Sequence, residues 1–317
     1  MPTHYSSVPD KIVPYKSTTS AAGSTPASYD ILLYPGFSQG GIVPSGHVSD
    51  YKLTIKLRLK LRQFTPAPLP LVWDADGKAF WTSPWTVADW QRFIAAATAQ
   101  ADMWNNKFWL QAPSTPTFFG PEYDKVVKER PNQAFRPNIR CALEVDFDPP
   151  EFATHRTIDI ANLNMGMLAG RTLTPGTFRS HSMLWDSLDG IPWAFPFGAG
   201  PGQPATHPVI AHEIGHLIGL GHIGAILKTP LCELAQTLDK IGGGTGDFNG
   251  GTNAFVCYGP GQGPIVGNIM GAGSVFSVEN ALPWMWSIAT LFPKTVGFGW
   301  RAVMRDPGPG SWIVLRN

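Results

Sequence analysis

Residues 208–222 read PVIAHEIGHLIGLGH, an apolar run that carries three histidines and one glutamate at fixed intervals. His212 and His216 are four residues apart, so a helix places both on one face, about one turn apart. The apolar residues recur at helical spacing and give such a helix one buried side: Ile210, Ile214, Leu217 and Ile218. The stretch therefore predicts a buried helix on which two imidazoles converge.

Gly219 and His222 extend the pattern beyond the helix. Glycine adopts a left-handed conformation at no steric cost, so Gly219 can end the helix and turn the chain to bring His222 back toward the other histidines. Neutral imidazole nitrogens suit Zn²⁺ in tetrahedral geometry. We therefore expect His212, His216 and His222 to bind one zinc ion, with the fourth position left open to water as in catalytic sites.

Glu213 follows the first of these histidines and is not needed as a ligand. Zinc lowers the pKa of a bound water to about 7, so the Glu213 carboxylate could take its proton while hydroxide attacks a carbonyl. The same carboxyl group could then return the proton to the leaving nitrogen. The residues thus predict hydrolysis of peptide bonds, with Glu213 as base and then acid.

The spacing of the histidines, Glu213 and Gly219 is a specific signal for a metal site. In a chain of this composition, the five fixed residues of HExxHxxGxxH should arise by accident on the order of once in 10⁵ sequences. A histidine on an apolar face is usually only a core residue with a polar partner, but three of them in one buried helix would each need a separate partner. The metal site is the simpler explanation.

HEIGHLIGLGH resembles the zinc-binding signature of the metzincin clan of metalloendopeptidases. Metzincins also have a methionine-containing turn beneath the zinc ligands, and GNIMGAG, residues 267–273, is similar to it. The resemblance implies that Met270 is a hydrophobic floor and not a ligand. It also implies that the following segment forms a wall of the substrate pocket.

GMLAGRTLTPG, residues 166–176, resembles the edge strand of matrix metalloproteinases, which pairs with an extended peptide substrate. We therefore expect a protein or peptide substrate along this segment. In those enzymes a histidine of this strand binds a second, structural zinc ion. Gly170 stands at that place here, so a second zinc ion is not expected.

The sequence departs from the known metzincin subfamilies at two positions, so its subfamily stays unassigned. Astacin-like and serralysin-like metzincins have a tyrosine two places after the methionine that assists the oxyanion. Ala272 occupies this place, so either Tyr258 or no residue takes that role. Ile223, which follows the third histidine, matches no particular subfamily.

Elements upstream of the motif predict a sheet with a backing helix. YKLTIKLRLKLRQF, residues 51–64, alternates apolar and basic residues and predicts a strand with one solvent-facing side. Its cations are expected to be solvated, and anion binding by this basic face is the other reading. Further strands are predicted within residues 139–148, 156–163 and 178–186. Residues 85–109 predict a long helix with Thr86 and Asp89 as its capping box. Its predicted apolar stripe is Val87, Trp90, Ile94, Ala97, Ala101, Trp104 and Phe108.

We expect an α+β fold of metzincin type: a twisted mixed β-sheet with a backing helix and an active-site helix, and a smaller irregular C-terminal subdomain. Residues 51–222 would form the upper subdomain, and residues 223–317 the lower one, with the methionine turn and a late helix within ENALPWMWSIATLF, residues 279–292. Residues 1–50 include STTSAAGSTPAS and are expected to be a partly disordered tail or a pro-segment.

Composition restricts the partners of this 317-residue chain. Its formal net charge of +1 gives no case for nucleic acid or an anionic membrane as the main partner, and no apolar run is long enough to cross a bilayer. We expect a monomer. The resemblance favours a secreted protein, although no signal peptide is visible, and delivery as an effector that cuts one intracellular protein is the other reading.

Cysteines and acidic residues suggest two further features. The three cysteines allow at most one disulfide, and Cys232 with Cys257 is the favoured pair because Cys141 lies in a strand-like run. Asp146, Asp148 and Glu151 lie close enough in sequence to suggest calcium, but an acidic strand end facing water explains them as well.

Two alternatives to the main reading stay open. Glu233 in LCELAQTLD could replace His222 as the third ligand, which would make the site similar to that of gluzincins. A binding protein that kept a zinc site but lost turnover is the other, although a purely structural metal site has no use for a base such as Glu213.

Overall fold

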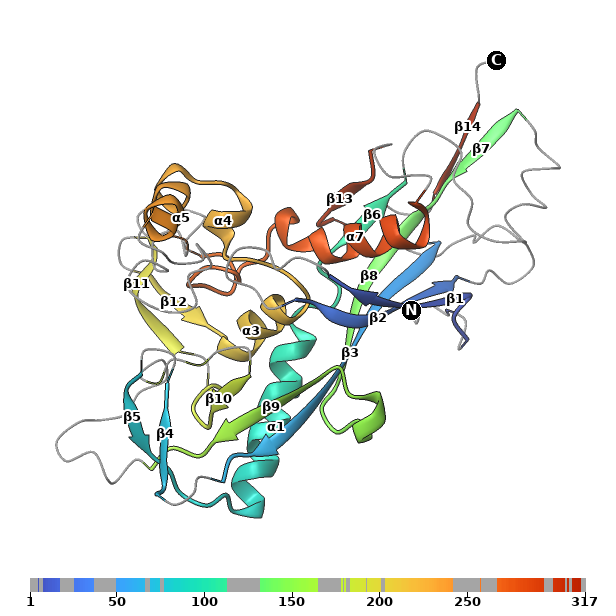
Figure 1. Ribbon diagram of the computed structural model, residues 1–317. Helices are drawn as coiled ribbons and strands as arrows, with labels where there is room; N and C mark the ends of the chain where they lie inside the picture. The colour runs from blue at the N-terminus through green and yellow to red at the C-terminus, as the bar shows by residue number, and fades with distance from the viewer. Residues whose placement is uncertain are drawn as a thin grey trace.

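The protein has an α+β fold built on one mixed, twisted sheet (Figure 1). The computed structural model describes residues 5, 8–17, 26–36, 50–65, 69–74, 77–112, 132–164, 178, 180, 183–191, 193–200, 203–241, 257, 267–293, 299–305, 307 and 310–314. Within these residues, no helix is both long and apolar enough to span a membrane.

The main sheet has eight strands in the order β1-β2-β3-β8-β6-β13, with β9 and β10 beside the second half of β3. β3 is parallel to both β8 and β9, and β9 is parallel to β10, whereas the other neighbours are antiparallel. The bounds are β1 Lys11–Lys16, β2 Ser28–Pro35, β3 Tyr51–Gln63, β6 Trp109–Gln111, β8 Asn138–Asp146, β9 Arg156–Ala161, β10 Leu184–Asp186 and β13 Arg301–Val303.

The alternation in β3 is confirmed. One face of the strand lies in the core, through Leu53, Ile55, Leu57, Leu59 and Leu61. On the opposite face, basic side chains pair with carboxylates of neighbouring strands and loops; Lys56 to Glu144 is 2.7 Å and Arg62 to Asp159 is 2.6 Å. Because strand side chains alternate between faces, one side of the sheet is apolar and the other is polar.

The expectation that residues 1–50 form a tail is wrong for the part that the structure describes. β2 lies between β1 and β3, and its Tyr29, Ile31 and Leu33 are buried in the core. A strand with neighbours on both edges is part of the sheet, so residues 28–35 are not a loose tail. Residues 18–25 and 37–49 lie outside the described residues.

The backing helix is α1, Val87–Asp102, and Thr86 is its N-cap: the Asp89 amide donates to the Thr86 hydroxyl at 3.1 Å. The helix ends before Phe108, and its stripe differs from the predicted one. Val87 is exposed, whereas Phe93 and Gln100 are buried. The apolar pattern missed Gln100 because a polar residue adds nothing to hydrophobic periodicity.

The other α-helices among the described residues are α3 Val209–Leu217, α4 Ile223–Ile226, α5 Pro230–Ile241 and α7 Leu282–Leu291, which follows the short helix η3 Val278–Ala281. α1, α3 and α7 pack on the apolar face of the main sheet, because Ala97, Ile214 and Trp284 belong to the same core cluster as the apolar residues of β3 (Figure 1).

Segments after residue 222 also pack in the main sheet and on its apolar face. β13 extends the main sheet by pairing with β6, and α7 contacts β3. The late helix is confirmed at Leu282–Leu291, with Pro283 in its first turn. Residues after 222 therefore contribute a strand to the main sheet and a helix to its apolar face.

In the part of the chain that the structure describes, three two-stranded sheets lie outside the main sheet: β4 Leu71–Trp73 with β5 Ala79–Trp81, β11 Trp193–Gly200 with β12 Gln203–His207, and β7 Gln133–Arg136 with β14 Ser311–Val314. The short helix η1 Glu151–Ala153 connects β8 with β9. Near it, the Asp148 carboxylate pairs with Lys60 and the Asp146 carboxylate accepts the Asp148 amide. No calcium cluster forms here among the described side chains.

Candidate metal centre

A side chain of α1 caps the first turn of helix α3. Its first residue follows Pro208, whose side chain cannot cap a helix, so the amides of Ile210 and Ala211 need another acceptor. The buried Gln100 provides it: its Oε1 accepts both amides, at 3.0 and 3.3 Å, and its Nε2 donates to the Asp189 carbonyl at 2.8 Å. Gln100 therefore caps α3 and ties it to the turn after β10.

The other end of α3 closes in a Schellman motif around Gly219. The Leu220 amide donates to the Gly215 carbonyl and the Gly219 amide to the His216 carbonyl, both at 2.9 Å. Gly219 has φ +102°, in the region that favours glycine, as the sequence predicts. The turn leaves the Leu220 carbonyl 2.7 Å from His216 Nδ1.

The structure brings the three predicted histidines together. His212 and His216 lie on one face of α3, and His222 follows the turn at the start of α4. One ligand nitrogen from each ring lies within 4.8 Å of the others, and all three residues are buried. This is the one cluster of at least three potential ligands that the described residues form.

Backbone carbonyls fix the tautomers of the first two rings. Ile269 O lies 2.8 Å from His212 Nδ1, and Leu220 O lies 2.7 Å from His216 Nδ1. A carbonyl can only accept, so each Nδ1 carries the proton and each Nε2 carries a lone pair. The two Nε2 atoms are 3.0 Å apart. Two lone pairs that face each other in a buried site are stabilised by a cation between them.

Charge on the rings is disfavoured as well. Burial, followed by the neighbouring histidines, lowers the pKa of His212 and of His222 well below 6.5. Burial also lowers the pKa of His216 to about 4, although its hydrogen bond to Leu220 acts in the other direction. At neutral pH the three rings are therefore neutral, which is the form that binds a metal ion.

These residues fit a metal ion. For two imidazoles on one tetrahedral ion, ligand distances of 2.0–2.1 Å imply a nitrogen separation of about 3.3 Å. The separation of 3.0 Å between the Nε2 atoms of His212 and His216 is close to that value. The carbonyls that accept from the two Nδ1 atoms orient the rings, as the hydrogen-bond partners of metal-binding histidines usually do.

Met270 packs against α3, beneath the histidines, where the resemblance of GNIMGAG to a methionine turn predicts it. It is fully buried, and a Cβ atom at Gly215 would overlap its sulfur, so glycine at that position lets the turn approach the helix. The Asn268 side chain accepts the Met270 amide at 2.8 Å and exchanges two hydrogen bonds of 3.1 Å with Asn280. This turn also supplies the Ile269 carbonyl that orients His212.

Glu213 is buried on α3 beside its first histidine. Burial raises the pKa of this carboxyl to about 8, and the charge of Asp189 adds to the effect. The pKa of Asp189 is itself raised to about 6 by burial. A cation held by the histidines would lower the pKa of Glu213, since an opposite charge favours the carboxylate.

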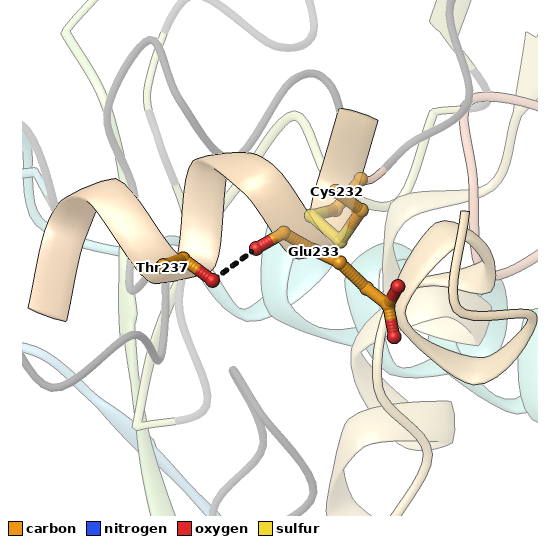
Figure 2. The surroundings of a disulfide bond; sticks show 4 residues. Cys232, Glu233 and Thr237 are labelled. Atoms are coloured by element: carbon orange, nitrogen blue, oxygen red, sulfur yellow. Dashed lines mark hydrogen bonds between the residues drawn. A yellow bond between two sulfur atoms is a disulfide. The ribbon is translucent and has the colours of Figure 1, made fainter. Parts of the chain in front are cut away.

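Glu233 does not join the cluster. It lies on the exposed side of α5, and Figure 2 shows its side chain extending away from the helix beside Cys232, while its carbonyl accepts the Thr237 hydroxyl at 2.8 Å. The predicted Cys232–Cys257 disulfide is confirmed, with a Cα separation of 4.8 Å, and Cys141 is free and buried.

Several residues of the site were not predicted from sequence. His207, in β12, lies with its ring centroid 4.9 Å from that of His212, and burial lowers its pKa to about 4. Gln100 and Asp189 act on α3 and Glu213 from segments far away in sequence. The expected substrate strand at residues 166–176, including Gly170, and the candidate Tyr258 lie outside the described residues.

The chain matches no protein-family model, no curated protein and no solved structure. A functional assignment therefore depends on the geometry of the site.

Proposed function

We propose that the protein is a zinc-dependent endopeptidase of metzincin type, with His212, His216 and His222 as metal ligands. The observation that carries this proposal is the pair of unprotonated Nε2 atoms 3.0 Å apart, each fixed by a backbone carbonyl on the other ring nitrogen. The third histidine, the positive φ of Gly219 and the buried methionine turn add the features that the metzincin resemblance requires.

Zinc suits this ligand set better than calcium or magnesium, which prefer oxygen ligands. Three histidines with no fourth ligand among the described residues are typical of a catalytic zinc site, because structural sites use four protein ligands. When bound, zinc polarises a substrate carbonyl and lowers the pKa of water.

Glu213 is the residue that moves the proton. Burial raises the pKa of this carboxyl group without metal, and a bound cation would lower it again, so that a carboxylate is available at neutral pH to act as base. The carboxylate would take a proton from the attacking water and return it to the leaving nitrogen. Gln100, the Ile269 carbonyl and the Leu220 carbonyl hold α3 and its imidazoles in place and exchange no proton.

The substrate and the compartment are part of the same proposal. A protein or peptide substrate would bind in an extended form along residues 166–176. The Cys232–Cys257 disulfide supports an oxidising compartment, and hence secretion. Cleavage of a mixed peptide library would distinguish a general endopeptidase from an effector with one target.

Digestion of casein or gelatin by the zinc-loaded protein tests the proposal. Replacing Glu213 by alanine should lower the rate by at least about 10²-fold while zinc remains bound, because only proton transfer is lost. Glu233→Ala is the matched control and should keep full activity. Equal activity of wild type and Glu213→Ala would show that the mechanism is wrong, and zinc binding without turnover in the wild type would favour a binding protein.

A further inference from the structure

Lys52 differs from the other cations on the polar face of β3. Lys56, Arg58, Lys60 and Arg62 each pair with a carboxylate. Among the residues that the structure describes, Lys52 forms no such ion pair. Its ammonium group instead lies 4.4 Å from the ring centroid of Tyr34 and 5.5 Å from that of Tyr5.

The neighbour of Lys52 across the sheet is a second cation. Lys52 and Arg140 are direct partners in the register of β3 and β8, so their side chains leave the same face. Like charges in this arrangement destabilise a sheet. Burial lowers the pKa of Lys52, the charge of Glu144 raises it, and Arg140 acts to lower it. Two cationic side chains therefore lie side by side at this position of the sheet.

These two cations line a pocket of about 360 Å³ on the polar face. The pocket forms where the pairing of β6 with β8 stops at Arg140; beyond it, the Leu143 amide donates to Asn105 Oδ1 at 2.9 Å. Its volume lies at the lower end of the range for ligand sites, roughly 300–1,000 Å³. The wall consists of Tyr5, Lys52, Thr54, Asn105, Arg140, Ala142, Leu143 and Glu144.

Thr54 adds a donor to this wall. Its side chain is 2% exposed, and its hydroxyl has no hydrogen-bond partner among the described residues. Leaving a buried hydroxyl unpaired costs free energy that a ligand oxygen would recover. Glu144 is the one acid in the wall, and its carboxylate is bound by Lys56 at 2.7 Å.

We propose that this pocket binds a small ligand through a phosphate-like or sulfate-like group, with Lys52, Arg140 and Thr54 as donors. A guanidinium fork, an ammonium group and a hydroxyl together match the several oxygens and the double charge of such an anion. The site lies on the face of the sheet opposite α3, so it is separate from the histidine cluster and does not depend on the proposed peptidase activity.

Titration calorimetry of the full chain with inorganic phosphate tests this site. We expect saturable binding of one anion per chain, with sulfate similar and acetate weaker because it presents fewer oxygens and a single charge. Lys52→Gln and Arg140→Gln should each weaken phosphate binding at least about tenfold. Arg62→Gln, at the far end of the same strand, should bind as the wild type does.

Thermal unfolding checks that the variants fold. Without phosphate, Lys52→Gln should unfold at the same or a higher temperature than the wild type, because a like-charge pair is removed, and it should lose the increase that phosphate gives the wild type. Thr54→Val, which is similar in shape, should weaken phosphate binding without unfolding the protein. Absence of saturable binding at millimolar phosphate, equal binding of acetate, or unchanged binding in both charge variants would overturn the proposal.

Discussion

Gly219 is the residue that turns the chain from α3 toward His222. Its φ of +102° disfavours any side chain, and a Cβ atom would lie 3.1 Å from Trp286 and 3.3 Å from Ala27. We expect Gly219→Ala to lower the free energy of unfolding by roughly 1–2 kcal/mol from backbone strain alone and to weaken zinc binding by displacing His222. Urea unfolding and zinc titration measure the two effects.

Gly77 offers a matched control for this substitution. Its φ is +74°, and a Cβ atom there would meet nothing within 4 Å. Gly77→Ala should show a similar backbone cost with unchanged zinc affinity. Unchanged zinc affinity in Gly219→Ala as well would contradict the role of this turn in placing the third ligand.

His207 gives a pH-dependent prediction at the same scale. Its pKa is lowered to about 4 in the folded protein, compared with 6.5 for an ordinary histidine. The unfolded chain therefore binds a proton more readily, so the contribution of His207 to stability is fully present above pH 6.5 and is lost as the pH falls toward about 4. The loss is up to about 3 kcal/mol.

Comparison with His207→Gln isolates this contribution from the buried carboxyl groups, whose raised pKa values act with the opposite sign. Urea unfolding of both chelator-treated proteins across this pH range should show the wild type losing stability relative to the variant as the pH falls. A difference that does not change with pH would contradict the assignment.

Gln100 connects two elements, α1 and α3. Its removal leaves two buried amides of α3 and the Asp189 carbonyl without their partner. We expect Gln100→Ala to lower the free energy of unfolding by about 1–3 kcal/mol and to weaken zinc binding, because α3 carries two of the ligands. Gln91→Ala on the exposed side of α1 should change neither quantity. Stability loss with unchanged zinc affinity would limit Gln100 to a purely structural role.

Elements with clear periodicity could be predicted from the sequence. The alternation of β3, the cap at Thr86, the helix that carries His212 and the late helix all follow from local patterns. The end of α1 and its buried face could not be predicted, because tertiary contacts of Phe93 and Gln100 decide which side faces the core. β2 was missed because Ile31, Leu32 and Leu33 form a short apolar run without alternation, and all three are buried.

At the scale of the whole molecule, the ligands could be predicted but the residues that orient them could not. His212, His216 and His222 stand in one local motif, whereas Ile269 and Asp189 reach α3 only through the packing of distant segments. The arrangement of the sheet explains this difference: a long connection separates β3 from its parallel partners β8 and β9, so residues far apart in sequence meet on one apolar face.

The central claim is that three imidazoles hold one zinc ion. Equilibrium dialysis of the purified chain against zinc, followed by metal analysis, tests it most directly. The account predicts one zinc ion per chain, retained in Glu213→Ala and Glu233→Ala and lost or strongly weakened in His222→Ala. A wild-type chain without zinc at saturating concentration, or zinc retained in His222→Ala and lost in Glu233→Ala, would contradict it.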